Sequence, residues 1–287
     1  MKVLLTGAKG QLGNCFIDRM PKEWQVITTD SNDLDITNES QVTEFVEEMR
    51  PDVIVNAAAY TAVDKAEEQI NIARLVNTNG PMYLAAAAKA FKARFVHVST
   101  DYVFDGTQAT PYTEDDLPNP LGVYGRTKLD GEVAVSEVYP DAIIIRTAWV
   151  FSEYGNNFLK TMLRLASERE QIGVVDDQYG CPTYAGDIAT AIIQLLIVRA
   201  PGGIYHFCGD EEMSWREFAE QIIIELNKEN KIKNMPVINR LTTEQYPTLA
   251  KRPKYSTLDC KKINRYDIKP SNFNVNVSKV INSIYQD

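Results

Sequence analysis

The sequence predicts an α/β fold in which a doubly wound parallel sheet is covered by helices on both faces. Three observations favour this class. Short β-rich runs alternate with helical patterns over the first half of the chain, and several of these runs are apolar without alternation, as in VIVNAAA and AIIIRTA. After about residue 150 the pattern changes to helices joined by loops rich in Gly, Pro and Asp. Strands separated by helices form parallel sheets through right-handed crossovers.

The elements can be assigned in chain order. Strands are expected at 3–6, 25–29, 53–56, 95–99 and 142–146, and helices near 11–20, 39–49, 80–93 and 125–138. Further helices are expected near 156–169, 185–199 and 215–228. We expect the helix at 185–199 and a strand at 204–207 to return to the first sheet. This predicts a first domain of residues 1–150, rejoined by 183–207, and a smaller α/β lobe made of 151–182 and 208–287.

Composition excludes several classes of function. The net charge of −9 would repel nucleic acid or an anionic membrane. Four cysteines without a Cys-x-x-Cys pair, and only two histidines, predict neither a zinc site nor a disulfide framework. No apolar run is long enough for a signal peptide or a membrane span. We therefore expect a soluble, cytoplasmic protein that binds a small molecule, and the charge alone favours neither an enzyme nor a binding module.

A glycine-rich loop after the first strand predicts a dinucleotide site. Residues 7–13 read GAKGQLG and open the first helix, where free N–H groups and the positive end of the helix dipole can hold a pyrophosphate. Asp30 stands 20 residues after Gly10, where an acid would accept hydrogen bonds from the adenosine ribose. The following SNDLDIT contains no Arg or Lys to neutralise a 2′-phosphate, which slightly favours NADH over NADPH. A glycine-rich turn without a ligand is the alternative.

Two further sets of polar residues fall beside the predicted sheet. VSTDYVFDG places Thr100 and Asp101 beyond the carboxyl end of a strand, where ligands bind in open parallel sheets. Tyr124 and Lys128 stand four apart on the next helix, so they share one face. A Tyr phenol with its pKa lowered from about 10 can donate a proton, and a neighbouring ammonium favours that lowering. Ordinary alternatives are a capping role for Thr100, a turn role for Asp101 and a chance Tyr-x-x-x-Lys spacing.

At this point the sequence resembles the extended short-chain dehydrogenase/reductases and, within them, the dTDP-4-dehydrorhamnose reductases. The motifs that carry the resemblance cover nearly the whole chain. They are LLTGAKGQLG (4–13), RPDVIVNAAAYTAVDKAE (50–67), VSTDYVFDG (98–106), VYGRTKLDGE (123–132), IRTAWVF (145–151), GNNFLKTMLRLA (155–166), DQYGCPTYAGD (177–187) and KRPKYS (251–256).

The resemblance implies a Rossmann-type domain, a sugar-nucleotide lobe and an oxidoreductase that uses NADH or NADPH. Hydride would pass to C4 of a 4-keto-6-deoxy sugar nucleotide while Tyr124 protonates the oxygen, Lys128 holds the nicotinamide ribose and Thr100 orients the ketone. The residues that would line the cofactor are Gly7, Gly10, Gln11, Leu12, Asp30, Asp35, Ile36, Ala58, Ala59, Tyr60, Tyr124 and Lys128. Those that would contact the sugar nucleotide are Thr100, Asp101, Trp149, Asn157 and Arg252.

Three of these carried-over residues also have ordinary explanations. Asn157 could cap the helix that starts beside it, Arg252 could be a solvated charge, and Trp149 could belong to the core. The chain also departs from the family at one point. Some members are described as Mg²⁺-linked dimers that use an acid just after the glycine loop, whereas residues 13–15 read GNC here. We therefore expect no structural Mg²⁺, and a homodimer of another kind stays open.

Related proteins supply the rival hypotheses. Sugar-nucleotide 4,6-dehydratases typically carry Thr-Asp-Glu at the strand end, where this chain has Tyr102 as the third residue, which argues against elimination. Epimerases and reductases of other nucleotide 4-keto sugars would show similar motifs. A regulatory subunit of methionine adenosyltransferase keeps the same fold without needing turnover, because fold alone does not fix function. Intact Thr100, Tyr124 and Lys128 favour catalysis.

Overall fold

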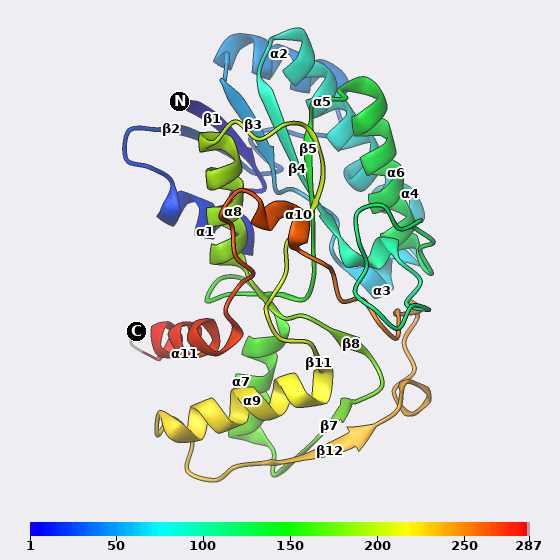
Figure 1. The fold of residues 1–287 in the computed structure, drawn as a ribbon, viewed down its shortest axis with the longest axis vertical. Coiled ribbons are helices and arrows are strands. Elements are labelled where there is room, and N and C mark those ends of the chain that lie inside the picture. The colour runs from blue at the N-terminus through cyan, green and yellow to red at the C-terminus, as the bar shows by residue number, and fades with distance from the viewer. Residues whose placement is uncertain (286–287) are drawn as a thin grey trace.

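The computed structural model describes residues 1–285 and is built around a six-stranded parallel sheet (Figure 1). The strand order is β10-β5-β4-β3-β1-β2, and each neighbouring pair is parallel. These strands are β1 (Lys2–Thr6), β2 (Gln25–Thr29), β3 (Val53–Asn56), β4 (Arg94–Thr100), β5 (Ile143–Thr147) and β10 (Gly203–His206). The order changes direction between β1 and β3, which makes that crevice the switch point of the sheet. The predicted doubly wound parallel sheet is confirmed.

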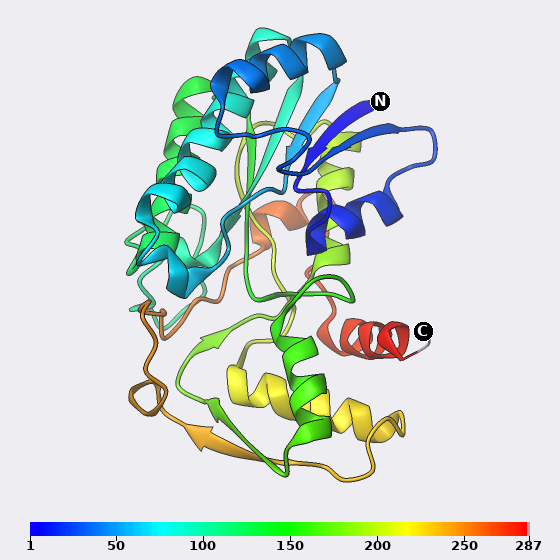
Figure 2. The ribbon, with the colours of Figure 1, turned by 180° about the vertical axis from the view of Figure 1, so that it is seen from behind.

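Helices cover both faces of the sheet, as the views from the front and from behind show (Figures 1 and 2). On one face lie α1 (Gln11–Arg19) and α8 (Ala185–Ile197), and on the other lie α2 (Glu39–Met49), α5 (Gly80–Ala90) and α6 (Val123–Val138). Successive strand residues point to opposite faces. Val3 and Leu5 therefore join the core beside α1 and α8, whereas Leu4 joins the core beside α2 and α5. Burial on both faces explains the uninterrupted apolar runs.

The segment between β3 and α5 holds elements that the sequence patterns did not predict. They are α3 (Val63–Ala66), α4 (Ile70–Arg74) and a π-helical turn at Leu75–Asn79. Helix α6 begins at Val123, two residues before the predicted position, because the Glu67 carboxylate accepts a hydrogen bond from the Val123 backbone N–H at 2.8 Å. This contact fixes the first turn of α6, which carries Tyr124.

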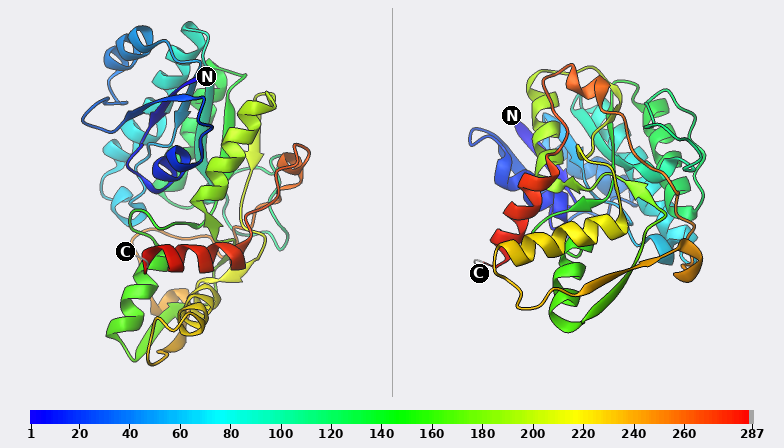
Figure 3. Two further views of the ribbon diagram at one scale, coloured as in Figure 1. Left: turned by 90° about the vertical axis from the view of Figure 1, so that its left-hand side faces the viewer. Right: turned by 60° about the horizontal axis from the view of Figure 1, so that its bottom comes forward.

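Most of the remaining chain forms a smaller lobe below the sheet (Figure 3), whereas the segment around residues 258–268 packs beside β10 in the core of the main sheet (Figure 1). The helices of the lobe are α7 (Phe158–Glu168), α9 (Trp215–Lys228) and α11 (Phe273–Ile284), and its main strands are β7 (Gln171–Val175) and β12 (Val237–Leu241). These helices and β7 share a separate apolar core that includes Phe151, Phe218 and Phe273. Short elements complete the fold: η2 (Asp101–Val103), β6 (Val150–Phe151), β8 (Tyr179–Gly180), β9 (Thr183–Tyr184), β11 (Met213–Ser214), η3 (Thr243–Gln245) and α10 (Lys261–Asn264). The division of the chain into two domains stays a prediction.

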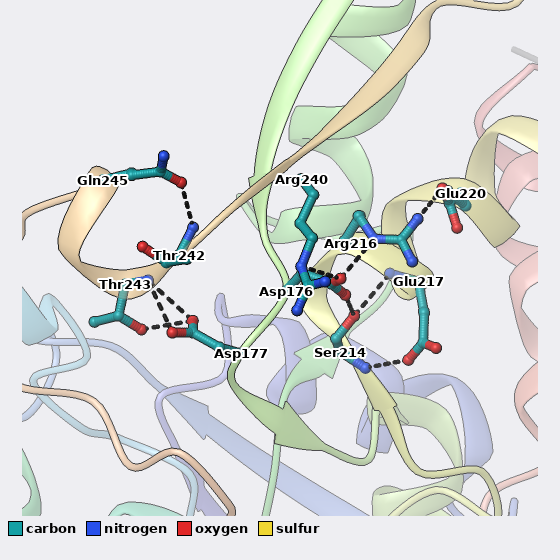
Figure 4. A network of polar contacts seen from close by, with 10 residues as sticks. All are labelled: Asp176, Asp177, Ser214, Arg216, Glu217, Glu220, Arg240, Thr242, Thr243 and Gln245. Atoms are coloured by element: carbon teal, nitrogen blue, oxygen red, sulfur yellow. Dashed lines mark hydrogen bonds and ion pairs between the residues drawn. The ribbon is translucent and has the colours of Figure 1, made fainter.

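A polar network ties the strands of this lobe to α9 (Figure 4). The buried Asp176 carboxylate, just after β7, accepts a hydrogen bond from Ser214 and pairs with Arg216 and Arg240 at 3.0 Å each. Ser214 also forms a capping box with Glu217 at the start of α9. These contacts hold the first residue of α9, Trp215, in place. Among residues 1–285, no helix combines the length and apolar character needed to span a bilayer.

Candidate active site

A cavity of about 820 Å³ opens at the carboxyl ends of the central strands, at the switch point of the sheet. Its walls come from the loops after β1, β2, β3 and β4, from the first turns of α6, and from the smaller lobe. The structure brings together fifteen of the residues singled out from the sequence. They are Gly7, Gly10, Gln11, Leu12, Asp30, Asp35, Ile36, Ala58, Ala59, Thr100, Asp101, Tyr124, Lys128, Trp149 and Asn157. Tyr60 and Arg252 are not among the lining residues.

The glycine loop forms one end of the cavity. Gly7 has a φ of 69°, and a Cβ placed there would lie 2.6 Å from the Ala58 backbone nitrogen, so only glycine fits. No side chain caps α1 at Gly10, which leaves the first N–H groups of this helix for a ligand oxygen. Backbone donors, the helix dipole and the absence of side-chain bulk fit the diphosphate of a dinucleotide.

Asp30 follows β2, and a lysine that the sequence patterns did not place there lies beside it. The exposed Lys9 ammonium, from the glycine loop, forms an ion pair with the Asp30 carboxylate. The hydrogen bond from Lys9, with further ones from backbone N–H groups, lowers the pKa of Asp30. A 2′-phosphate here would therefore meet a compensating cation, contrary to the expectation from the residues after Asp30, because Lys9 reaches Asp30 from the glycine loop. Asp35 instead accepts hydrogen bonds from Thr37 within its own turn, at 2.9 and 2.7 Å.

Thr100 and Asp101 sit at the end of β4, as predicted, and both are buried. The Thr100 hydroxyl accepts from the Tyr102 backbone N–H at 3.2 Å, so it does cap the 3-10 turn η2, and it donates to Asp101 at 3.0 Å. The second Asp101 carboxylate oxygen, Oδ2, has no hydrogen-bond partner, and burial raises the pKa of Asp101 to about 6. Thr147 at the end of β5 also has an unpartnered hydroxyl in the cavity wall. These polar atoms can bond to a polar ligand.

Tyr124 and Lys128 project from α6 into the same cavity. Gly125 lets α6 approach the loop after β4 closely, since a Cβ there would collide with the Tyr102 carbonyl oxygen. Burial raises the pKa of Tyr124 to about 12, and hydrogen bonding to Thr100 opposes this rise. Burial lowers the pKa of Lys128 to about 8. The expectation that the Lys128 charge lowers the Tyr124 pKa is therefore wrong for this structure, because burial dominates and Lys128 is not among the groups that shift this pKa.

The smaller lobe contributes a pair of stacked indoles. Trp149 lies 3.5 Å from Trp215 between ring centroids, with an interplanar angle of 5°, and both line the cavity. Trp149 has a φ of 46°, an unfavourable backbone conformation that this stacking helps to maintain. Sequence reasoning missed Trp215, because nothing in its local pattern distinguishes it from a core residue of α9.

Asn157 joins the lobe to the glycine loop. Its side-chain oxygen caps α7 by accepting from the Lys160 N–H at 3.0 Å, and its amide donates to Gln11 at 2.9 Å. Arg252, in contrast, pairs bidentately with Asp64 at 2.7 and 3.2 Å and is partly buried. Tyr60 donates to Gln69 at 2.9 Å. The capping explanation of Asn157 is thus confirmed, whereas the contacts of all three residues with ligands stay predictions.

The part of the chain that the structure describes contains no group of three or more His, Cys, Asp or Glu side chains that could hold a metal ion. The cavity wall presents hydroxyl, carboxyl, amine and indole groups beside the glycine loop. A proton donor, an amine and an orienting hydroxyl beside such a loop are the groups that reduction of a carbonyl requires.

The chain is similar to known proteins over almost its whole length. The family model described as the RmlD substrate binding domain matches residues 1–286. The dTDP-4-dehydrorhamnose reductase of Aggregatibacter actinomycetemcomitans is 46% identical over 280 residues, which cover 95% of each chain. A solved dTDP-4-dehydrorhamnose reductase from Clostridium acetobutylicum has a TM-score of 0.93 at 39% identity, covering 99% of this chain and 100% of its own. The Bacillus anthracis enzyme, solved in complex with NADP, has a TM-score of 0.92 at 37% identity, covering 98% and 99%. The chain therefore belongs to the dTDP-4-dehydrorhamnose reductase family of oxidoreductases.

Proposed function

We propose that this protein reduces dTDP-4-dehydro-6-deoxy-L-mannose to dTDP-L-rhamnose with NADH or NADPH. The observation that carries the proposal is that Thr100, Tyr124 and Lys128 line one cavity together with the glycine loop. Family membership supports a nucleotide 4-keto sugar as the substrate. The stacked indoles of Trp149 and Trp215 and the unpartnered oxygen of Asp101 suit the apolar faces and hydroxyls of a deoxy sugar.

In the proposed mechanism, the glycine loop would hold the dinucleotide by its diphosphate, and the reduced nicotinamide would supply the hydride. The Thr100 hydroxyl holds the substrate carbonyl in line, and the Tyr124 phenol gives its proton to the oxygen as charge develops there. Burial raises the pKa of Tyr124, so the phenol is protonated at neutral pH and carries the proton that it would transfer. Lys128 holds the ribose next to the nicotinamide and can restore the Tyr124 proton. Asp101 would bind sugar hydroxyls, and Asn157 and Arg252 would contact the nucleotide or its diphosphate.

The Asp30 carboxylate and the Lys9 ammonium favour different cofactors. The Asp30 carboxylate suits the ribose hydroxyls of NADH. Lys9 is exposed beside it and can turn from Asp30 to a 2′-phosphate. We therefore propose that the protein uses both NADH and NADPH.

The test is oxidation of NADH and of NADPH, each with dTDP-4-dehydro-6-deoxy-L-mannose made in the cuvette by its upstream enzymes. We expect rapid oxidation and formation of dTDP-L-rhamnose. Tyr124→Phe should abolish this reaction while keeping cofactor affinity. The matched control is Tyr139→Phe, which removes a phenol that donates to the Ala93 carbonyl at the far end of α6 and should leave the rate unchanged.

Other outcomes would identify the rival functions. Oxidation of NADH or NADPH with a different nucleotide 4-keto sugar, but not with this one, would show that the substrate is another keto sugar and that the reaction type is as proposed. Cofactor binding without any oxidation, together with a stable complex with methionine adenosyltransferase, would indicate that the protein is a regulatory subunit and not a reductase. Full activity of Tyr124→Phe would reject Tyr124 as the proton donor.

A further inference from the structure

A chain of buried polar contacts runs from Lys128 into the sheet, behind the cavity wall. The Lys128 Nζ atom lies 3.4 Å from Nε2 of His97, and Nδ1 of the same ring lies 3.0 Å from Nδ2 of Asn56. Asn56 on β3 and His97 on β4 are register partners in the parallel sheet. Their side chains are fully buried, and Lys128 is 2% exposed. The side chains of Asn56 and His97 therefore need hydrogen-bond partners among their buried neighbours.

The orientation of the Asn56 amide is fixed by its neighbours. Its side-chain oxygen accepts from the Ala58 backbone N–H at 3.1 Å and from the Thr6 hydroxyl at 2.7 Å. A backbone N–H can only donate, so the atom facing Ala58 must be the oxygen. The Asn56 nitrogen therefore donates to His97, and Nδ1 of His97 must be the acceptor. A neutral imidazole that accepts at Nδ1 carries its proton on Nε2.

The Nε2–H of His97 consequently points at the Lys128 nitrogen. A doubly protonated ring would set a second N–H against the Asn56 amide, and burial, together with the Lys128 charge, lowers the pKa of His97 well below its usual value. Lys128 already donates to the Val98 carbonyl at 2.6 Å. An N–H dipole with its positive end toward Lys128 disfavours the ammonium, whereas a neutral amine can turn its lone pair to accept from His97.

Other charged groups around Lys128 do not reverse this effect. Burial is the first cause of the lowered pKa of Lys128, and Glu132, one turn further along α6, opposes it. The Glu132 carboxylate is held by Arg146 through contacts of 2.7, 3.0 and 3.1 Å and by the Ser99 hydroxyl, so its charge is largely neutralised. Tyr124 on α6 and Asp101 on η2 share the cavity with Lys128.

We propose that Asn56 and His97 are positioning residues that hold an N–H against Lys128, so that its ammonium readily releases a proton. The catalytic role of this arrangement rests on the proposed function. After Tyr124 has given its proton to the substrate oxygen, the phenolate takes one from the Lys128 ammonium. The resulting amine accepts the His97 hydrogen bond and regains a proton from solvent, which completes the proton balance of the cycle.

The first test needs neither a variant nor a substrate. Two histidines stand in the sequence, so a protein labelled with ¹⁵N in its imidazole rings gives a simple NMR spectrum. His206 is an internal control, because its Nδ1 lies 3.0 Å from the Tyr112 carbonyl oxygen and its Nε2 faces Arg146. We expect the proton on Nε2 in His97 and on Nδ1 in His206. A proton on Nδ1 of His97, or on both of its nitrogens, would overturn the proposal.

The second test is Asn56→Asp, which replaces the amide donor with an acceptor of the same shape. Nδ1 of His97 must then donate, so its Nε2 presents a lone pair that stabilises the Lys128 ammonium. We expect the His97 spectrum to change accordingly and the basic limb of the kcat profile to move up by about one pH unit, with KM for the keto sugar unchanged. Thr6→Val is the control, because the Ala58 N–H still orients the amide and the tautomer should stay on Nε2.

The two tests separate this inference from the proposed function. Absence of any reduction with the His97 proton on Nε2 would reject the proposed function and leave the positioning of Lys128 supported. A switched tautomer in Asn56→Asp without a shift of the pH profile would overturn the positioning role while the reductase activity stands.

Discussion

Replacing Asp101 with asparagine should stabilise the protein at neutral pH and impair its reaction. The Asp101 side chain is 2% exposed, and its Oδ2 atom has no hydrogen-bond partner. Burial raises the pKa of this carboxyl to about 6, against about 4 in an unfolded chain. The native state therefore binds the Asp101 proton more tightly than the unfolded state does, and ionising this group weakens the fold.

The size of the effect follows from the pKa difference. A rise of about two pH units corresponds to a loss of about 3 kcal/mol in the free energy of unfolding once both states are ionised. Asparagine avoids this loss but buries an amide nitrogen where Oδ2 has no partner, at a cost of about 1 kcal/mol. We therefore expect Asp101→Asn to gain about 2 kcal/mol at pH 8 and to lose about 1 kcal/mol below pH 4, with the change of sign as pH rises through the interval from about 4 to 6.

Urea unfolding at a series of pH values measures this directly. The matched control is Asp105→Asn, four residues along, where hydrogen bonds from Asn119 and Thr107 lower the pKa to about 2. That variant should be less stable than the parent at neutral pH, and the difference should vanish as pH falls toward 2. A stability change in Asp101→Asn that does not vary with pH would refute the reasoning. Activity assays should show a lower kcat/KM for the keto sugar at unchanged cofactor affinity.

Three further predictions concern the cofactor end of the cavity and the buried ion pair. Lys9→Ala should lower kcat/KM for NADPH about tenfold and leave kcat/KM for NADH nearly unchanged, since it removes the cation beside Asp30 but no ribose contact. Equal losses with both cofactors would contradict this role of Lys9. Gly7→Ala should weaken binding of both cofactors at least about tenfold, because residue 7 is left-handed and its new Cβ would collide with the Ala58 backbone. Fluorescence titration measures the affinity, and a wild-type affinity would count against the glycine loop as the diphosphate site. Arg146→Met should cost about 3–5 kcal/mol in urea unfolding by leaving Glu132 buried without its partner, and a loss below about 1 kcal/mol would show that the pair adds little.

The sequence predicts the sheet well because its strands are short, apolar and separated by helices with clear periodicity. Expected strand 142–146 differs from β5 (Ile143–Thr147) by one residue at each end, and expected strand 204–207 is similarly displaced from β10 (Gly203–His206). Motifs tied to backbone geometry also locate the cavity, because the glycine loop and the ends of β2 and β4 must meet at the switch point.

What escaped prediction depends on contacts between distant segments. The π-helical turn at Leu75–Asn79 packs on α6 and shows no periodicity of its own. Strands β7 and β12 pair across more than 60 residues of sequence. Lys9 reaches Asp30 from another loop, and Arg252 binds Asp64, so neither partner can be read from the neighbouring sequence. Side-chain pairing of this kind becomes visible only when the segments are placed in space.

The position of β10 at the edge of the sheet has a consequence for how the chain can fold during synthesis. All five residues of β5 are buried, yet the strand that covers its open side, β10, begins at Gly203, some 56 residues after Thr147. Until that strand leaves the ribosome, β5 presents unpaired backbone groups flanked by Ile side chains, which is the kind of edge that pairs with other chains. A nascent chain that stalls between these two strands is consequently exposed to aggregation, and the first 150 residues expressed alone should need a chaperone to stay in solution.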